Sequence, residues 1–123
     1  MAVVTEIPGI ASGHEIITPG DVSTGITAGL LTPASGSFNA MNAVAGLITA
    51  ENQTMHFTLD GTAPTAAAGT DLGHDLAAGD SYMIRGKTNM ANFRIIDRVS
   101  GSAGQLKVTV FHAFNSDEPD AGP

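Results

Sequence analysis

The sequence contains no cysteine and no tryptophan, and only one tyrosine and five phenylalanines among its 123 residues. The absence of cysteine excludes both a disulfide framework and a thiolate metal site. It also favours folding in a compartment where disulfides are not formed. Because aromatic residues are scarce while the hydrophobic fraction is 42%, we expect a thin core built mainly from aliphatic side chains.

Positive charge is scarce as well. Five Lys and Arg stand against twelve Asp and Glu, for a net charge of −7, and all five basic residues lie in the C-terminal half. Binding to nucleic acid depends on basic side chains that neutralise phosphates, so we expect no nucleic-acid partner. No apolar run is long enough to span a bilayer, and Met-Ala-Val-Val-Thr-Glu does not resemble a signal peptide. We therefore expect no membrane partner and synthesis in a cytoplasm.

The size and the turn-forming residues predict the fold class. A chain of 12.5 kDa corresponds to one domain. Fifteen Gly and six Pro divide it into short segments, which favours short strands over long helices. We predict an all-β protein with a single β-sandwich or jelly-roll-like domain over residues 26–114, an N-terminal arm or edge strands over 1–25, and a short acidic tail over 115–123.

The most informative stretch is 55–65. Met55, Phe57 and Leu59 alternate with His56 and Thr58, which is the period of a strand with one buried face. Asp60-Gly61 is a turn signal and Pro64 removes a backbone donor, so the strand ends there and a shaped loop follows. Further strands are predicted over 81–85, over 93–99 with Phe93, Ile95 and Val99 inward, and over 105–114.

One other segment is ambiguous. The alanine-rich run 40–50 fits a helix or a strand, and we choose a strand over 44–50 that forms a hairpin through 51–53 into 54–59. Residues 86–89 are predicted as a turn.

Candidate interface residues fall in two places. The N-terminal region has few large side chains apart from isoleucines, and it fits either an arm that lies on a neighbouring subunit or a strand of this chain's own sheet. On the strand over 93–99, arginines flank an outward isoleucine, which suits a contact surface or an ordinary solvated face. The candidate interface residues are Ile7, Ile10, Ile16, Ile17, Arg94, Ile96 and Arg98.

The sequence gives little support for a metal site or a catalytic site. The histidines, His14, His56, His74 and His112, lack the close spacing of structural zinc ligands. A jelly-roll metalloenzyme would need His56 and His112 to face each other on neighbouring strands. Asp71, Asp75 and Asp80 do not match a calcium-binding loop, and no nucleophile motif occurs. We expect no catalytic residue, no bound metal and no cofactor, and hence not an enzyme.

An ordered set of segments resembles the small structural proteins of tailed-bacteriophage virions. The set consists of 57–65, Gly73 and Leu76, 78–81, 92–96 and 106–111, and spans about half of the chain. The resemblance implies an all-β module in the particle, often a capsid cement or decoration protein. It brings no catalytic residues, and the first 50 residues depart from the pattern.

We therefore expect a virion protein on the capsid surface, made in the host bacterial cytoplasm. It would bind the major capsid protein, stabilise the head by bridging subunits, and form a homo-oligomer, for which a trimer is our choice. Two alternatives stay open: a module associated with the tail, fibre or head spike, and a cupin-like metal-binding enzyme.

Overall fold

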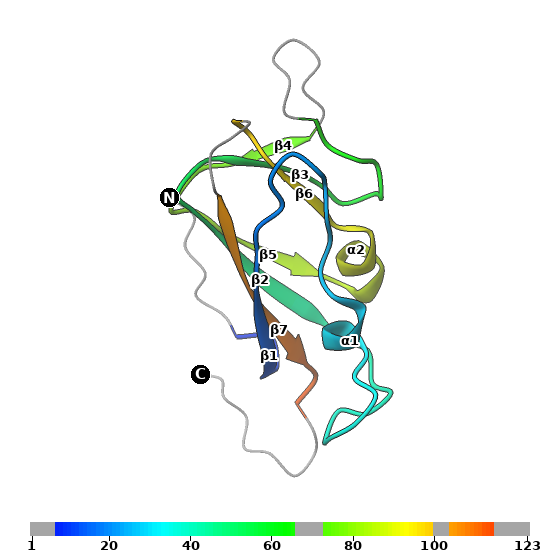
Figure 1. Cartoon of the computed structure of the whole chain (residues 1–123). Coiled ribbons are helices and arrows are strands. Elements are labelled where there is room, and N and C mark those ends of the chain that lie inside the picture. Colours follow the sequence, from blue (N-terminus) through cyan, green and yellow to red (C-terminus); the bar gives the residue numbers. More distant parts are fainter. Residues whose placement is uncertain (1–6, 66–72, 100–103, 115–123) are drawn as a thin grey trace.

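The structure, a computed structural model, describes residues 7–65, 73–99 and 104–114. Seven strands form two antiparallel sheets. Sheet A contains β1 (Ile10–Ile17), β7 (Gln105–His112), β2 (Ala45–Glu51) and β5 (Ser81–Arg85), in that order. Sheet B contains β4 (His74–Leu76), β3 (Met55–Thr58) and β6 (Arg94–Asp97). Figure 1 shows sheet B crossing one end of sheet A. The all-β, sandwich-like class is confirmed, while the jelly-roll variant stays a prediction.

The core lies between the two sheets. Strand alternation brings Ile48 of β2 and Val108 of β7 together as partners within sheet A. Sheet B contributes Met55 and Phe57 of β3 and Ile95 of β6 to the same core. These side chains are at most 6% exposed. In the last strand, which was predicted over 105–114, Leu106, Val108 and Val110 alternate along the chain and are all buried in this cluster.

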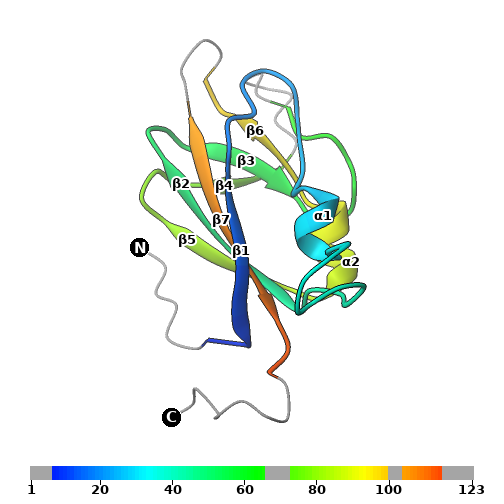
Figure 2. The same cartoon turned by 60° about the horizontal axis from the view of Figure 1, so that its bottom comes forward.

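Two short helices lie side by side at one edge of the sandwich (Figure 2). The first, α1, spans Ala28–Leu31, and the second, α2, spans Lys87–Asn92. Helix α2 replaces the turn predicted over 86–89. Six residues are too few for a helical period to be visible in the sequence. Met90, which is fully buried, packs over Gly46, where an added Cβ would lie 3.3 Å from the Met90 Sδ.

The predicted hairpin through 51–53 is wrong, although the strand before it is correct. Strand β2 pairs with β7 and β5, whereas β3 pairs with β4 and β6. Residues 51–53 therefore carry the chain from one sheet to the other, with Asn52 at a positive φ of 76°. Adjacent strands in a sandwich connect within one sheet or between sheets, and local turn chemistry does not distinguish the two cases.

The N-terminal segment is part of the domain. Strand β1 pairs along its length with β7, from Ile10 opposite His112 to Ile17 opposite Leu106. Thr24 then exchanges two backbone hydrogen bonds with Ile95, of 3.0 and 2.8 Å, and so covers the outer edge of β6. From residue 10 onward, the structure therefore favours the edge-strand alternative over the arm. Residues 1–6 and the tail at 115–123 lie outside the described residues.

Ile48→Ala tests the packing between the sheets, and Ile16→Ala is its matched control. Ile48 is fully buried, whereas Ile16 of β1 is 55% exposed. We expect Ile48→Ala to lower the free energy of unfolding by about 2–5 kcal/mol because it leaves a cavity, and Ile16→Ala to change it by less than about 1 kcal/mol. Urea unfolding measures both. Equal losses would contradict the placement of the core.

Candidate functional site

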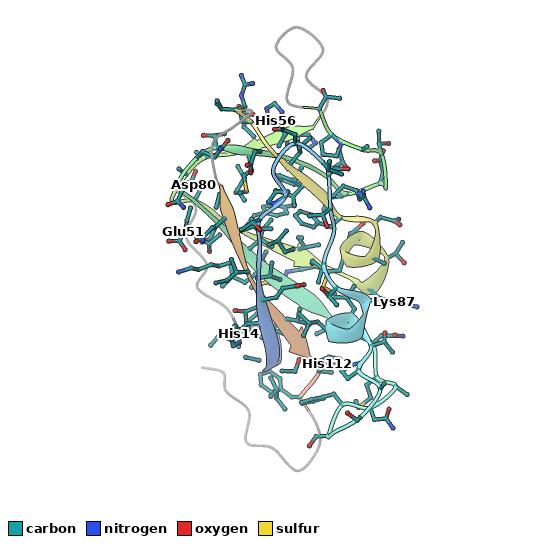
Figure 3. The ribbon with its side chains drawn as sticks, in the orientation of Figure 1. His14, Glu51, His56, Asp80, Lys87 and His112 are labelled. Carbon is teal, nitrogen blue, oxygen red and sulfur yellow. The ribbon has the colours of Figure 1, made fainter. Side chains whose placement is uncertain are left out.

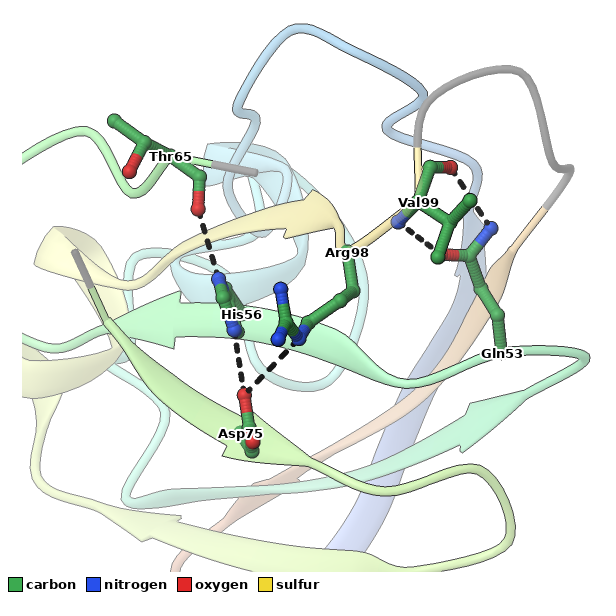
Figure 4. A network of polar contacts seen from close by, with 6 residues as sticks. All are labelled: Gln53, His56, Thr65, Asp75, Arg98 and Val99. Atoms are coloured by element: carbon green, nitrogen blue, oxygen red, sulfur yellow. Dashed lines mark hydrogen bonds and ion pairs between the residues drawn. The ribbon is translucent and has the colours of Figure 1, made fainter. Parts of the chain in front are cut away.

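A network of polar contacts lies on the face of sheet B that points away from sheet A (Figure 4). At its centre is His56 of β3, whose side chain is only 2% exposed. Its Nδ1 lies 2.8 Å from the carbonyl oxygen of Thr65, and its Nε2 lies 2.5 Å from Oδ1 of Asp75 on β4. The Nε of Arg98 lies 3.9 Å from the same carboxylate oxygen. His56 is thus held between a loop and a neighbouring strand.

The Thr65 carbonyl determines the role of one ring nitrogen of His56. A backbone carbonyl only accepts, so Nδ1 donates to Thr65. The other ring nitrogen, Nε2, faces the Asp75 carboxylate, and Arg98 adds a positive charge beside that carboxylate. Because Asp75 is 64% exposed, solvent screens its charge, and the contact serves mainly to orient the buried ring.

The loop after β3 folds back over this face of the sheet. Thr58 Oγ1 donates to the Thr62 carbonyl at 2.5 Å, and the Thr62 N–H donates to the Asp60 carboxylate at 3.0 Å. Hydrogen bonds from the backbone and the side chain of Thr62 to the carboxylate lower the pKa of Asp60. Pro64 is buried. The shaped turn predicted at Asp60-Gly61 is confirmed, with Gly61 at a φ of +88°, and its role is to cover β3.

Gly73 shows how closely the returning chain approaches. Its φ is +127°, which L side chains rarely adopt. An added Cβ would lie 3.0 Å from the Phe57 carbonyl oxygen and 3.2 Å from the Pro64 Cβ. Position 73, which belongs to the segments that resemble phage structural proteins, therefore requires glycine for a steric reason.

A second buried polar group is Asp97, at the end of β6. The residue is 1% exposed. Its Oδ2 accepts from the Gly104 N–H at 3.3 Å, and its Oδ1 has no hydrogen-bond partner among the described residues. Burial raises the pKa of Asp97, and the negative charge of Asp21 raises it further. Sequence reasoning missed this residue, although it follows Phe93 and Ile95 in the inward series.

A third group joins Ser12 and His112. Ser12 lies where the register of β1 shifts, between Ala11 and Gly13, and its Oγ lies 2.5 Å from His112 Nδ1. His112 Nε2 donates to the Met41 carbonyl at 2.9 Å, and the ring of Phe38 stacks on it with centroids 4.8 Å apart. His112 is fully buried. All these contacts are internal, so the Ser-His pair holds the loop with Phe38 and Met41 against β7.

Two adjoining hollows open beside β4, one toward the loop after β3 and the other toward β5. One, of about 430 Å³, is lined by Thr58, Asp60, Thr62 and Gly73, and the other, of about 390 Å³, by aromatic and acidic residues of β3, β4 and β5. Leu59 and His74 line both.

The histidines do not form the metal site that the cupin alternative requires. His56 lies in sheet B and His112 in sheet A, at opposite ends of the molecule (Figure 3). Each is held by its own neighbours, and His14 lies apart from both on β1. Within residues 7–65, 73–99 and 104–114, no three His, Cys, Asp or Glu side chains gather around a point that could hold a metal. Of the calcium candidates, Asp71 lies outside the described residues.

The structure divides the candidate interface residues. Ile7 and Ile16 are 62% and 55% exposed, and Ile10 is half-buried. Ile17, at 7%, belongs to the core and is therefore a correction, because the end of β1 turns into the sandwich.

The predicted patch on β6 is also corrected. Ile96 does point away from sheet A, but it is only 6% exposed, so it is not a surface residue. Arg94 is half-buried and donates from Nη2 to the backbone carbonyl and hydroxyl of Ser23, at 2.8 and 3.0 Å. Arg98 turns to Asp75. Val99, predicted inward, is 55% exposed.

Comparisons of the chain with protein-family models, with curated proteins and with solved structures found no match. A search of the described helices found none long and apolar enough to cross a membrane.

The raised pKa of Asp97 predicts a pH effect on stability. Between the ordinary Asp pKa of about 3.9 and the raised folded value, the folded state binds more protons than the unfolded state, so stability falls as pH rises through this window. Asp97→Asn should remove this fall and be no less stable than the parent at neutral pH.

The control is Asp60→Asn, because the pKa of Asp60 is shifted the opposite way. Its folded pKa is lowered, so its contribution is present above the unfolded pKa and lost as pH falls through the folded pKa. Urea unfolding from about pH 3 to 7 measures both variants. An unchanged pH profile for Asp97→Asn would contradict the raised pKa.

His56→Ala tests the polar network on sheet B. We expect a loss of about 1–3 kcal/mol in the free energy of unfolding, since the substitution removes a buried donor and leaves the Thr65 carbonyl without it. His14→Ala, at an exposed position of β1, is the control and should change stability by less than about 0.5 kcal/mol. Chemical denaturation compares them, and equal effects would show that the network contributes nothing.

Proposed function

We propose that this chain is a structural protein of a tailed-bacteriophage virion, a cement or decoration protein that binds the major capsid protein and bridges neighbouring subunits of the head. The observation that carries the proposal is the surface beside β1. Two isoleucines, Ile7 and Ile16, are exposed there, next to a strand that lies at the edge of sheet A.

An edge strand is a natural place for attachment. Among the described strands, β1 pairs only with β7, so its other side offers backbone donors and acceptors to a partner strand. The register shift at Ala11/Gly13 is a β-bulge type of irregularity, which limits indiscriminate pairing along the strand. Exposed isoleucines beside this edge would supply apolar contact area to a specific partner.

The segments that resemble phage structural proteins and the N-terminal segment would have different roles. Of these segments, 57–65, Gly73, Leu76 and 92–96 lie in sheet B or in the loop that covers it, and 106–111 lies in β7 of sheet A. They therefore build the scaffold. The N-terminal segment, which departs from the resemblance, supplies the outer edge of sheet A, where attachment would differ between particles.

The role follows from interface physics. A protein that contacts two shell subunits adds buried area that must be separated before the shell opens. The net charge of −7 favours basic surfaces on the partner. In this proposal the protein acts as an oligomer, with a trimer as the chosen state, on the capsid surface, after synthesis in the host bacterial cytoplasm. It acts through binding and not through catalysis.

The test is quantitative mass spectrometry of gradient-purified particles from the phage that encodes the chain. A cement protein should be present in amounts comparable to the major capsid protein. A few copies per particle would instead support a tail, fibre or head-spike module, and absence from the particle would overturn the virion proposal.

The attachment surface is tested by occupancy on particles that lack the protein. Ile7→Glu combined with Ile16→Glu should reduce binding by about tenfold or more, since it places charge in an apolar contact. Val22→Glu makes the same change at a side chain that is 75% exposed elsewhere and should leave occupancy unchanged. Equal occupancy for both variants would show that the β1 surface is not the contact.

A further inference from the structure

The two sheets have four edge strands among the described residues, and three of these edges are protected against pairing with another chain. Strand β6 is covered by Thr24, β4 has only three residues, and β1 carries a register shift between Ala11 and Gly13. Strand β5 pairs with β2 in five successive residue pairs with no shift, and its sequence, Ser-Tyr-Met-Ile-Arg, contains no Pro and no Lys. Covering segments, short strands, bulges, lysines and prolines are the usual devices that block an edge, so β5 is an open one.

Two hydrogen bonds at the ends of β5 fix the direction of its backbone groups. The Ala50 N–H donates to the Asp80 carbonyl at 3.1 Å, and the Gly86 N–H donates to the Val44 carbonyl at 2.9 Å. The two residues on the β5 side of these bonds both have even numbers. Because the backbone groups of successive residues in an antiparallel strand face alternate sides, the even-numbered residues of β5 bond to β2.

The odd-numbered residues of β5, Ser81, Met83 and Arg85, therefore direct their N–H and C=O groups away from β2. The Arg85 carbonyl accepts from Asn89 Nδ2 at 2.9 Å, which agrees with this direction and leaves the oxygen a second lone pair. Within residues 7–65, 73–99 and 104–114, these backbone groups have no other hydrogen-bond partner. The edge of β5 thus offers a row of donors and acceptors to another strand.

A second copy of β5 fits this edge when it runs antiparallel about a two-fold axis at Met83. Met83 then lies opposite Met83 of the second copy, and Ser81 lies opposite the second copy's Arg85. This register pairs all five residues of each strand, and in it the outward-facing backbone groups lie opposite one another. Each facing pair can exchange two N–H···O bonds. A register centred on Tyr82 or Ile84 would pair only three residues of each strand.

The side chains of β5 are compatible with this register. On the outer face of sheet A, Met83 would contact its own copy, and Ser81 would lie beside Arg85, so no like charges are opposite. The two Arg85 residues lie at opposite ends of the contact, roughly 14 Å apart for four strand residues, and salt screens their repulsion over that distance. On the inner face, Tyr82, which is 40% exposed, would lie beside Ile84 of the second copy and lose apolar surface to solvent.

We propose that two copies of this chain associate through β5, so that their two sheets A become one continuous antiparallel sheet across a two-fold axis. A contact of five residues on each side is smaller than a standard protein interface, so the association is expected to be weak. The inference concerns the free chain and does not rest on capsid binding. The trimer proposed for the capsid surface would need a different contact.

Sedimentation equilibrium of the full chain tests the association. Between about 10 μM and about 1 mM protein, we expect the mean mass to rise from 12.5 kDa, the mass of one chain, toward twice that value. The mass of a single chain at the highest concentration would overturn the inference. Association that stops at three chains would also overturn a two-fold contact.

Amide hydrogen exchange, followed by NMR, locates the contact within the strand. The amides of Tyr82 and Ile84 bond to β2 and should be protected at every concentration. Those of Ser81, Met83 and Arg85 should exchange about fivefold more slowly or less at the highest concentration than at the lowest, because only the dimer gives them a partner. Protection that appears on β1 and not on these amides would assign the contact to the other edge of sheet A and overturn the inference.

Met83→Lys places two ammonium groups opposite each other across the two-fold axis. We expect the dissociation constant of the dimer to rise by about tenfold or more, since like charges directly opposite destabilise a strand pair and an edge lysine blocks it. The matched control is Val22→Lys, which adds the same charge outside the strands at a side chain that is 75% exposed. It should change the constant by less than about twofold. Equal effects would mean that only net charge matters and would overturn the site.

Met83→Pro removes one outward-facing N–H and leaves the bonds between β5 and β2 in place, since Pro is accepted on an edge strand where its nitrogen faces solvent. Circular dichroism shows whether the variant is folded, and the folded variant should stay monomeric at all concentrations. Dimerisation equal to that of the parent would contradict the backbone pairing. If this variant does not fold, Met83→Lys and the amide exchange of the parent chain decide the question.

Capsid occupancy separates this inference from the proposed function. A Met83→Lys chain that is monomeric and still shows normal occupancy would establish that dimerisation and attachment through β1 are independent. Absence of the chain from particles would overturn the virion proposal but would leave the measured mass of the free chain unchanged.

Discussion

The structure depends on burying β3, the central strand of sheet B, from both sides. All four residues of β3 are buried, although only Met55 and Phe57 face sheet A. Sheet A covers one face, and the loop over 59–65 covers the other. Because β3 alternates apolar and polar residues, its second face brings His56 and Thr58 out of water, and each of these needs a hydrogen-bond partner there. The loop supplies both partners, through the carbonyls of Thr65 and Thr62.

This arrangement separates a rigid scaffold from surfaces that face other molecules. Polar contacts inside sheet B hold its covering loop, and Arg94 attaches the segment near Ser23 to β6. The edge of β1 and the cleft between β4 and β5 are among the exposed features of the described residues. Both lie where a sheet ends, because pairing within each sheet satisfies the backbone groups of the interior strands and leaves those of the edges. The attachment surface proposed at β1 therefore lies at an edge that the sandwich leaves open.

Much of the fold could be predicted from local patterns. Alternation identified β3, β5, β6 and β7, and Asp-Gly chemistry identified the turn after β3, whereas β2 was chosen as a strand because of a hairpin that does not form. The sheet to which each strand belongs could not be predicted, because the turn at 51–53 looks alike in a hairpin and in a crossing between sheets. Period alone also placed Ile96 on the outer side of its strand, but a loop distant in sequence determines whether that side meets solvent. The burial of Asp97 and the contact of Asp75 with His56 were missed for the same reason, since the surroundings of both residues come from other segments.

The pairing of β1 with β7 joins the two ends of the domain, with Ile10 opposite His112. Sheet A therefore cannot be completed until the residues of β7 have left the ribosome. Until then, β1 has no partner in its own sheet, and β2 lacks its neighbour on one side. Such long-range pairing makes folding slow relative to helical domains of this size, and the unpaired edges are then open to other chains. Strand β1 must therefore remain unpaired in sheet A until β7 has been synthesised.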